Sequence, residues 1–206
     1  MAFCDNCELN DRWPLPHPIC MSPPENIQGI LISRDPTSAF IEPYRTQKKN
    51  EGLFQFNAPP KWLCCRIQSF MKYSINSPEL EKIRNFLNWN CYWTHFHKCP
   101  TIKGVKNLQF SYKHGKMCAD QWFDNECTTY DLNGKILILL GQDLKKNFRE
   151  CKEDHQIFRN NHVICLPHPS SANVGNGWSW NLKMPEDDEN KKSVKAAINE
   201  LLMRLG

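Results

Sequence analysis

The sequence predicts an α/β protein built on a layered, mostly parallel sheet. Four short apolar runs, at 27–33, 91–97, 135–141 and 162–166, end at polar or proline-containing turns, as buried strands do. Helical patterns lie between and after them, and strands that alternate with helices favour parallel pairing. A chain of 206 residues without an internal repeat or an interdomain linker suits one domain, so we predict a single domain over 1–206.

Two helices can be placed from local signals. The first begins at Ser77-Pro78, because Ser is a favoured N-cap and Pro is favoured at the first helical position. The second covers 192–205 and follows an acidic stretch, 185–190, that we expect to form an exposed turn. Both helices have apolar side chains at helical spacing. These are Leu80, Ile83, Phe86 and Leu87 in the first, and Val194, Ile198, Leu201, Leu202 and Leu205 in the second.

The composition favours an intracellular protein. The N-terminus, MAFCDNCELNDRW, lacks the apolar region of a signal peptide, and no apolar run reaches the roughly 20 residues of a membrane span. The alternative for a chain with 11 cysteines is a secreted, disulfide-stapled domain, but such scaffolds are usually much shorter. We expect a cytoplasmic, reducing location, free thiols and a monomer. The formal charge of +4 permits nucleic-acid binding without arguing for it.

Two widely separated pairs of cysteines indicate a thiolate-bound centre. A CxxC pair at the N-terminus lets two thiolates hold one metal or cluster, and a second pair must complete a four-sulfur site. The predicted ligands are Cys4, Cys7, Cys99 and Cys118. Either Cys20 or Cys127 is an alternative for the fourth ligand. Ligand type alone leaves both zinc and a [4Fe–4S] cluster open.

Polar groups follow the predicted strands. In open parallel sheets, ligands bind beyond the carboxyl ends of the strands, so these groups predict a site. They are Arg34-Asp35-Pro36, the segment 95–99, Gly141-Gln142-Asp143 and His168-Pro169-Ser170-Ser171.

Asp35 and His168 are the strand-end residues best suited to catalysis, and each also has a purely structural interpretation. Asp35 suits the orientation or activation of a water, whereas the alternative is an Asp-Pro turn that ends a strand. His168 suits hydrogen bonding to a developing anion, and the serines after it suit a phosphate. The alternative there is a loop with an exposed histidine.

Aromatic residues suggest contacts with a base. Alternation along an extended segment would place Phe54 and Phe56 on one face, where either ring can stack on a flat ligand. Val174 or Trp178, around a glycine-rich stretch, can push into a base stack. The alternatives are core packing for the phenylalanines and a surface loop with a packed Trp178.

Taken together, ILISRDP, YWTHFHKCP, KILILLGQ and HPSSAN resemble motifs of the uracil-DNA glycosylase superfamily, over most of the chain. The order and spacing of the four cysteines are most similar to the iron–sulfur branch, family 4. The resemblance implies a three-layer fold with a central four-stranded parallel sheet, and a [4Fe–4S] cluster with zinc as the alternative. Its implied partner is DNA with a uracil or modified base.

The resemblance also assigns roles. Asp35 matches the carboxylate of the family 1 motif Gly-Gln-Asp-Pro-Tyr, which activates water or stabilises the cation; family 4 usually has a small residue there. His168 matches the histidine that hydrogen-bonds to the departing base. Arg34 and either Phe54 or Phe56 would bind the base. The resemblance places further DNA contacts at Ser170, Ser171, Asn173, Val174 and Trp178.

His95 is the main departure from these motifs. It stands in Tyr92-Trp93-Thr94-His95, where many of these enzymes have an Asn that reads uracil. A neutral histidine also has one donor and one acceptor, but its reach and shape differ. The leading hypothesis is a DNA glycosylase acting on uracil or another non-standard base. The alternatives are a glycosylase for a bulky cytosine-derived base of phage DNA that serves defence, a weakly catalytic module that binds damaged bases, and a zinc-stabilised nucleotide-handling enzyme.

Overall fold

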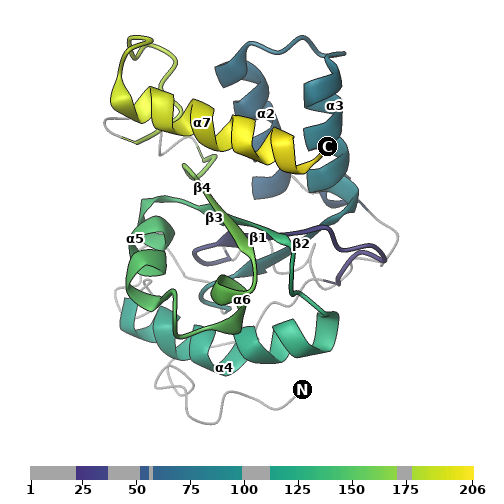
Figure 1. The fold of residues 1–206 in the computed structure, drawn as a ribbon, viewed down its shortest axis with the longest axis vertical. Coiled ribbons are helices and arrows are strands. Elements are labelled where there is room, and N and C mark those ends of the chain that lie inside the picture. Colours follow the sequence, from purple (N-terminus) through teal and green to yellow (C-terminus); the bar gives the residue numbers. More distant parts are fainter. Residues whose placement is uncertain (1–21, 37–51, 56–57, 99–111, 171–177) are drawn as a thin grey trace.

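One parallel sheet organises the chain (Figure 1), whose computed structural model describes residues 22–36, 52–55, 58–98, 112–170 and 178–206. The strands are β1 (Gly29–Ser33), β2 (Cys91–His95), β3 (Ile136–Leu140) and β4 (His162–Leu166). Their order is β2-β1-β3-β4, and every pairing is parallel. The predicted fold class, a four-stranded parallel sheet between helices, is therefore confirmed.

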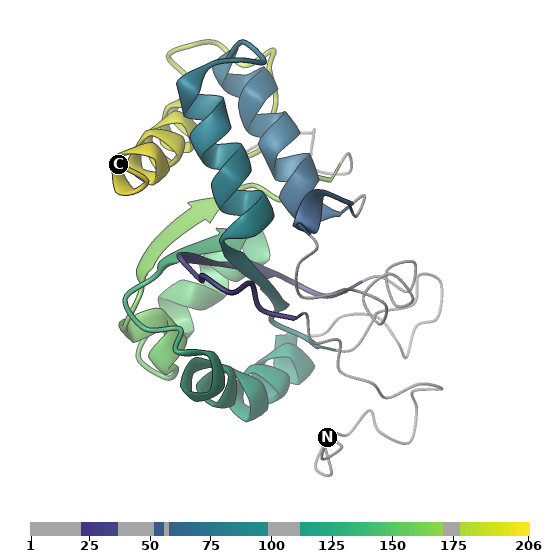
Figure 2. The ribbon, with the colours of Figure 1, turned by 90° about the vertical axis from the view of Figure 1, so that its right-hand side faces the viewer.

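Helices cover both faces of the sheet (Figures 1 and 2). One face carries α2 (Pro59–Met71), α3 (Pro78–Trp89) and α7 (Glu189–Arg204). The opposite face carries α4 (Tyr112–Tyr130), α5 (Gln142–Cys151) and α6 (Gln156–Arg159). A 3-10 helix, η3 (Leu53–Gln55), precedes α2. The resulting three layers bury β1 and β2 along their whole length.

Close packing of α3 on β1 depends on a glycine. A Cβ placed on Gly29 would lie 2.1 Å from Cζ of Phe86, which is a side chain of α3. Both residues are buried in the interior, where packing density is close to that of an organic crystal. A strand residue with no side chain is therefore what lets the aromatic ring approach the sheet.

Capping side chains set the starts of α3 and α7. Ser77 Oγ accepts a hydrogen bond from Leu80 N at 3.2 Å, which confirms the predicted start at Pro78. The last helix begins at Glu189 rather than at residue 192, because the Asp188 side chain caps it. The acidic stretch thus supplies the N-cap and the first turn of α7. Negative side chains at this end of a helix interact favourably with the helix dipole.

Three of the predicted strands are a little longer than the observed ones, whereas the strand predicted at 162–166 has the bounds of β4. β1 begins at Gly29 rather than at 27, and β2 ends at His95 rather than at 97. Parallel hydrogen bonding nevertheless continues past β2, since Phe96 N donates to Ser33 O and His97 N donates to Arg34 O, both at 2.9 Å. The backbone bends there while its hydrogen bonds to the β1 side persist.

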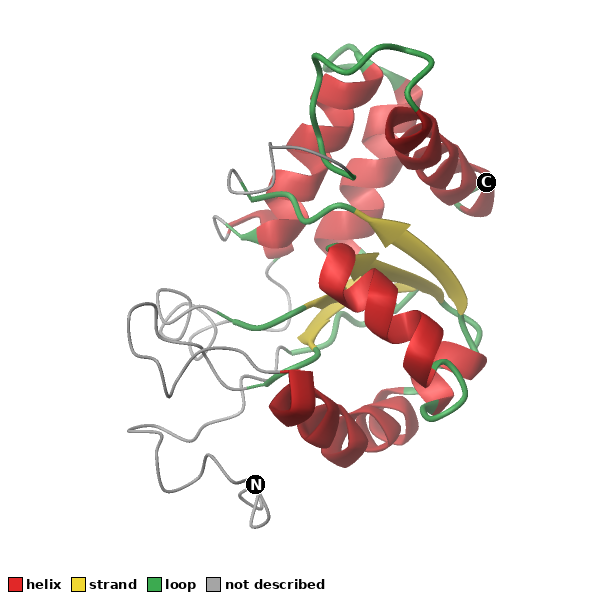
Figure 3. Ribbon diagram, turned by 90° about the vertical axis from the view of Figure 1, so that its left-hand side faces the viewer, coloured by secondary structure: helices red, strands yellow, loops and turns green. Residues whose placement is uncertain are grey.

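The strand order creates a switch point between β1 and β3. After β1 the chain passes to the helices on one face, and after β3 it passes to α5 on the opposite face (Figure 3). The helices reached after these two strands therefore lie on opposite faces, and open α/β sheets bind ligands beyond the carboxyl ends at such a switch point.

Among the helices that the structure describes, none combines the length and the apolarity that a membrane crossing needs.

Candidate functional site

Arg34 joins the residues that directly follow β1 and β3 at the switch point. Its Nε donates to Asp35 Oδ1 at 2.5 Å, and its Nη1 donates to Asp143 Oδ2 at 3.1 Å. Asp35 follows β1, whereas Asp143 lies in the first turn of α5, directly after β3. One guanidinium thus connects the carboxyl ends of the two central strands.

The two carboxylates that contact Arg34 differ in exposure. The Asp35 side chain is 7% exposed, and the Asp143 side chain is 61% exposed. Partial burial of Arg34 lowers its pKa, but hydrogen bonds and charge from Asp35 and then Asp143 outweigh this and raise it overall. Asp35 is therefore the carboxylate held inside the site, while water screens Asp143.

His168 is held as a neutral imidazole. Burial, followed by the positive charge of Arg34, lowers the pKa of His168 to about 4, while Asp35 opposes the shift. Its Nδ1 accepts a hydrogen bond from the backbone N–H of Ser170 at 3.3 Å and lies 3.0 Å from Ser170 Oγ. Because Nδ1 is an acceptor, the ring proton of the neutral form is on Nε2. His168 thus presents an N–H donor near Arg34 and Asp35.

Gly141 shapes the turn beside His168. It has φ 106°, a conformation that favours glycine, and stands directly between β3 and α5. Its N–H donates to Leu166 O at 2.8 Å, which ties the turn to the end of β4. A Cβ added there would lie 3.5 Å from the Cβ of His168. The turn after β3 and the loop after β4 therefore meet at this histidine.

His95 lies at the carboxyl end of β2 and is 1% exposed. Burial lowers its pKa well below the usual range, and charge on Lys98, His97 and His168 acts in the same direction. Its ring centroid is 5.0 Å from that of Trp93, on the same side of the strand. His95 is therefore neutral at physiological pH and carries one donor and one acceptor.

Cys118 is the one predicted cluster ligand within the described part of the chain. Its Sγ accepts a hydrogen bond from the backbone N–H of Lys98 at 3.2 Å. Cys4, Cys7 and Cys99 lie outside the described residues, as does the alternative ligand Cys20. Within the described ranges, no group of three or more metal-binding side chains occurs. The sulfur nevertheless touches the backbone one residue before Cys99.

Cys127, the other alternative ligand, lies in the core. It is 0% exposed, and burial raises the pKa of its thiol to about 12. A metal or cluster ligand must be a thiolate, which this environment disfavours. Of the two cysteines on α4, Cys118 is the one whose surroundings suit a ligand.

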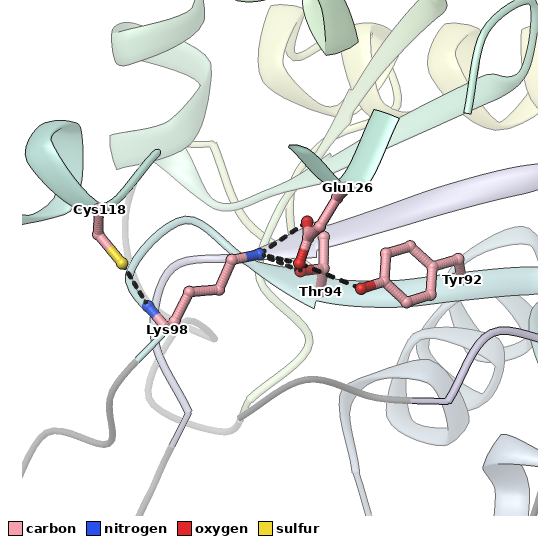
Figure 4. A network of polar contacts seen from close by, with 5 residues as sticks. All are labelled: Tyr92, Thr94, Lys98, Cys118 and Glu126. Atoms are coloured by element: carbon pink, nitrogen blue, oxygen red, sulfur yellow. Dashed lines mark hydrogen bonds and ion pairs between the residues drawn. The ribbon is translucent and has the colours of Figure 1, made fainter. Parts of the chain in front are cut away.

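A buried ion pair that the sequence analysis missed lies next to Cys118 (Figure 4). The Lys98 and Glu126 side chains are 0% and 5% exposed, and Lys98 Nζ donates to Glu126 Oε1 at 2.7 Å. Lys98 Nζ also bonds Thr94 Oγ1, and Glu126 accepts from Tyr92 OH at 3.1 Å. The network fixes α4 to β2 and places the Lys98 backbone at the Cys118 sulfur. The only sequence signal was a lysine at the end of an apolar run.

The prediction of an extended segment at Phe54 is wrong. Residues Leu53–Gln55 form the 3-10 helix η3 and not an extended segment, so alternation does not put Phe54 and Phe56 on one face. The backbone N–H of Phe54 donates to Asn88 Oδ1 at 2.6 Å, which anchors the turn to α3, and its ring is partly buried against the core. Phe56 lies outside the described residues.

Two of the five predicted DNA contacts, Ser170 and Trp178, lie within the described residues. Ser170 is described and lies against His168. Trp178 is half-buried against the core with Lys145 Nζ 4.1 Å from its ring centroid, so the indole would have to leave this position to enter a base stack. Ser171, Asn173 and Val174 lie outside the described residues.

The chain is an α/β protein with a parallel sheet, and its candidate site lies at the switch point of that sheet. The site brings together Arg34, Asp35, Asp143 and His168, with His95 at the end of the neighbouring strand β2. A scan against protein-family models finds no matching family, and no curated protein matches the sequence.

Proposed function

We propose that the protein is a DNA glycosylase that flips a uracil or another non-standard base out of DNA and hydrolyses its N-glycosidic bond. The observation that carries the proposal is the pairing of an inward carboxylate, Asp35, with a neutral histidine, His168, at one strand-edge site. The product would be an abasic site. The resemblance of Asp35 to the family 1 carboxylate and of His168 to the motif histidine is in accord with this chemistry, whereas the resemblance to family 4 concerns the cysteines.

The reaction requires opposite charges to be stabilised at two places. A base within a duplex must first leave the stack, which costs a few kcal/mol. Cleavage of the glycosidic bond then leaves positive charge on the sugar and negative charge on the base. Asp35 would stabilise the sugar cation and orient the attacking water, and His168 Nε2–H would donate to the base oxygen that becomes negative.

The hydrogen bonds around these groups favour their assigned orientations. Arg34 holds Oδ1 of Asp35, and the N–H of Ser170 occupies Nδ1 of His168. A donor that is already oriented needs no reorganisation as charge develops, which is the main source of this kind of stabilisation. A charged imidazolium would lose the Ser170 N–H contact, so the neutral form suits the role.

The proposed cofactor is a [4Fe–4S] cluster held by Cys4, Cys7, Cys99 and Cys118. Cys118 supports it, because a thiolate that accepts a backbone N–H bond is typical of such ligands. The cluster would be structural and would take no part in bond cleavage. Iron, sulfide and zinc are to be measured in protein purified without oxygen, together with visible absorption. Loss of iron in Cys118→Ser but not in Cys165→Ser is expected, while bound zinc without iron contradicts the cluster.

The activity test uses DNA oligonucleotides that contain uracil, hypoxanthine or modified cytosines, with alkali to reveal abasic sites. Asp35→Asn should lower the rate by at least about a hundredfold, since the carboxylate charge would be lost at the cation. Asp143→Asn is the matched control, because it removes the exposed carboxylate that contacts the same arginine. If no substrate yields abasic sites, or if Asp35→Asn keeps full activity, the proposal fails.

A second candidate function is a glycosylase for a bulky, cytosine-derived base of phage DNA. His95 favours it, because it is neutral, buried and close enough to His168 for the charge of that residue to affect the pKa of His95. Its shape differs from that of the Asn expected in a uracil reader. His95→Asn should shift the preference among the same oligonucleotides toward uracil. An unchanged substrate profile would exclude His95 from base reading.

A further inference from the structure

A groove lies between α2 and the loop after β4, beside the candidate site. Its cavity volume is about 370 Å³, within the range of small-ligand sites. We call it the α2 groove and define it by the residues that line it. These are Trp62, Cys65, Arg66, Ser69, Pro169 and Ser170.

The helix contributes four of these residues from one face. Trp62, Cys65, Arg66 and Ser69 follow the spacing i, i+3, i+4, i+7, which aligns side chains along a single side of a helix. The other side of α2 is buried through residues such as Leu63, Ile67 and Phe70. The groove side is thus the face of α2 that the core leaves available.

Arg66 fixes the wall of the groove and supplies its positive charge. Its Nε donates to Pro169 O at 3.1 Å, which joins α2 to the loop that carries His168. Among the described residues that line the groove, Arg66 is the one cation, and none is a carboxylate. Ser69 and Ser170 lie in the same lining. The Ser69 hydroxyl donates to Cys65 O at 3.0 Å, and the Ser170 hydroxyl lies 3.0 Å from Nδ1 of His168, so each would exchange a local hydrogen bond for one to a ligand oxygen. A guanidinium beside serine hydroxyls is a donor set that proteins use for phosphate.

We propose that the α2 groove binds one nucleotide of the DNA strand that flanks the nucleotide in the candidate site. Arg66, with Ser69 and Ser170, would bind its phosphate, and Trp62 would contact its base. Ser170 supports the continuity, because its Oγ lies 3.0 Å from Nδ1 of His168 and also lines the groove. The inference rests on the proposed function, since it needs a DNA strand at His168.

Binding of a fluorescently labelled, unmodified single-stranded oligothymidine tests the groove without any glycosidic cleavage. Arg66→Gln should weaken binding about tenfold, as expected for a lost charge-assisted hydrogen bond. It should also reduce the slope of log K against log salt by about 0.7, the value for one phosphate on a single strand. Arg66→Lys should restore the slope. Arg84→Gln, which replaces an arginine of α3 that pairs with Glu81, should change neither quantity.

A merely structural role for Arg66 would give a different result. If Arg66 only holds Pro169, its replacement weakens binding without changing the salt slope, and the proposal is overturned. Cys65 provides a second measurement in the unaltered protein, because it is exposed and lines the groove. The oligonucleotide should slow alkylation of Cys65, followed by peptide mass spectrometry, and an unchanged alkylation rate with bound oligonucleotide overturns the proposal.

These outcomes are independent of the glycosylase test. Abasic-site formation by the wild type, together with an Arg66→Gln variant of unchanged affinity and slope, overturns the groove and leaves the enzyme. If Arg66→Gln reduces the slope of log K against log salt as expected, but no oligonucleotide yields abasic sites, the groove is supported and the glycosylase proposal fails.

Discussion

Replacing Lys98 by methionine tests whether the buried network holds β2 to α4. Methionine keeps most of the side-chain volume and removes the charge. It leaves Glu126, which is 5% exposed, without its cation. Removing one partner of a buried pair typically costs about 3–5 kcal/mol, because the remaining charge stays desolvated. For a domain of this size that corresponds to a melting temperature lower by roughly 6–20 °C.

Urea unfolding under reducing conditions, followed by circular dichroism, measures the loss. The matched control is Lys192→Met, which breaks an exposed pair with Glu189 whose side chains are 54% and 88% exposed. Pairs of this kind contribute about 0–1 kcal/mol, so the control should remain close to the wild type.

The double variant Lys98→Met/Glu126→Gln identifies the cause of the loss. The glutamine side chain introduced by Glu126→Gln is neutral, and its carbonyl oxygen can still accept from Tyr92 OH and Thr94 Oγ1, the groups that now bond Glu126. The double variant should therefore be more stable than Lys98→Met alone. If Lys98→Met costs no more than Lys192→Met, or if the second substitution adds to the loss, the buried charge does not hold these elements together.

Three further predictions concern stability. The folded protein keeps His168 neutral, since its pKa is lowered from 6.5 to about 4, so stability is full above about pH 6.5 and falls as the pH drops toward 4. Between about pH 7 and pH 5 the contribution of His168 amounts to roughly 2 kcal/mol, so urea titrations should show a loss of stability that is smaller by this amount in His168→Gln, where the contributions of His95 and His155 remain. Gly29→Ala should cost about 1–3 kcal/mol, measured by thermal unfolding, because its Cβ would meet Phe86 at 2.1 Å; an unchanged melting temperature would contradict this packing. Ser77→Ala should cost about 1 kcal/mol through the lost N-cap, whereas the exposed Ser193→Ala should lie within about 0.5 kcal/mol of the wild type.

The sheet could be predicted from the sequence because its signals are local. Runs such as KILILLG are apolar along their whole length and end at turns, which is how strands buried on both faces appear. The start of α3 was equally local, since Ser77 and Pro78 together specify it. The start of α7 was missed because Asp188 and Glu189 are polar, and the periodicity of the apolar face begins only after them.

The site could be predicted in part. Strand ends identified Arg34, Asp35, Asp143 and His168, because parallel topology alone collects these positions at one edge. Which of these groups pair with one another did not follow from the sequence, and neither did the partner of Lys98. Asp143 contacts Arg34 across 109 positions, and Glu126 contacts Lys98 across 28, so no local pattern links them. The error at Phe54 had a local cause, since alternation was assumed where the backbone turns into η3.

The ion pair between Arg34 and Asp143 has a consequence for the order of events during synthesis. Asp35 emerges from the ribosome long before Asp143 and His168, and β1 becomes a central strand only when β3 pairs with it. Parallel pairing between strands so far apart in the sequence is slow, because the chain loses loop-closure entropy before the strand contacts form. A nascent chain that ends before β3 therefore carries the first carboxylate without the rest of the site. The DNA binding that we propose for the switch point should therefore begin only once the second half of the chain has been made.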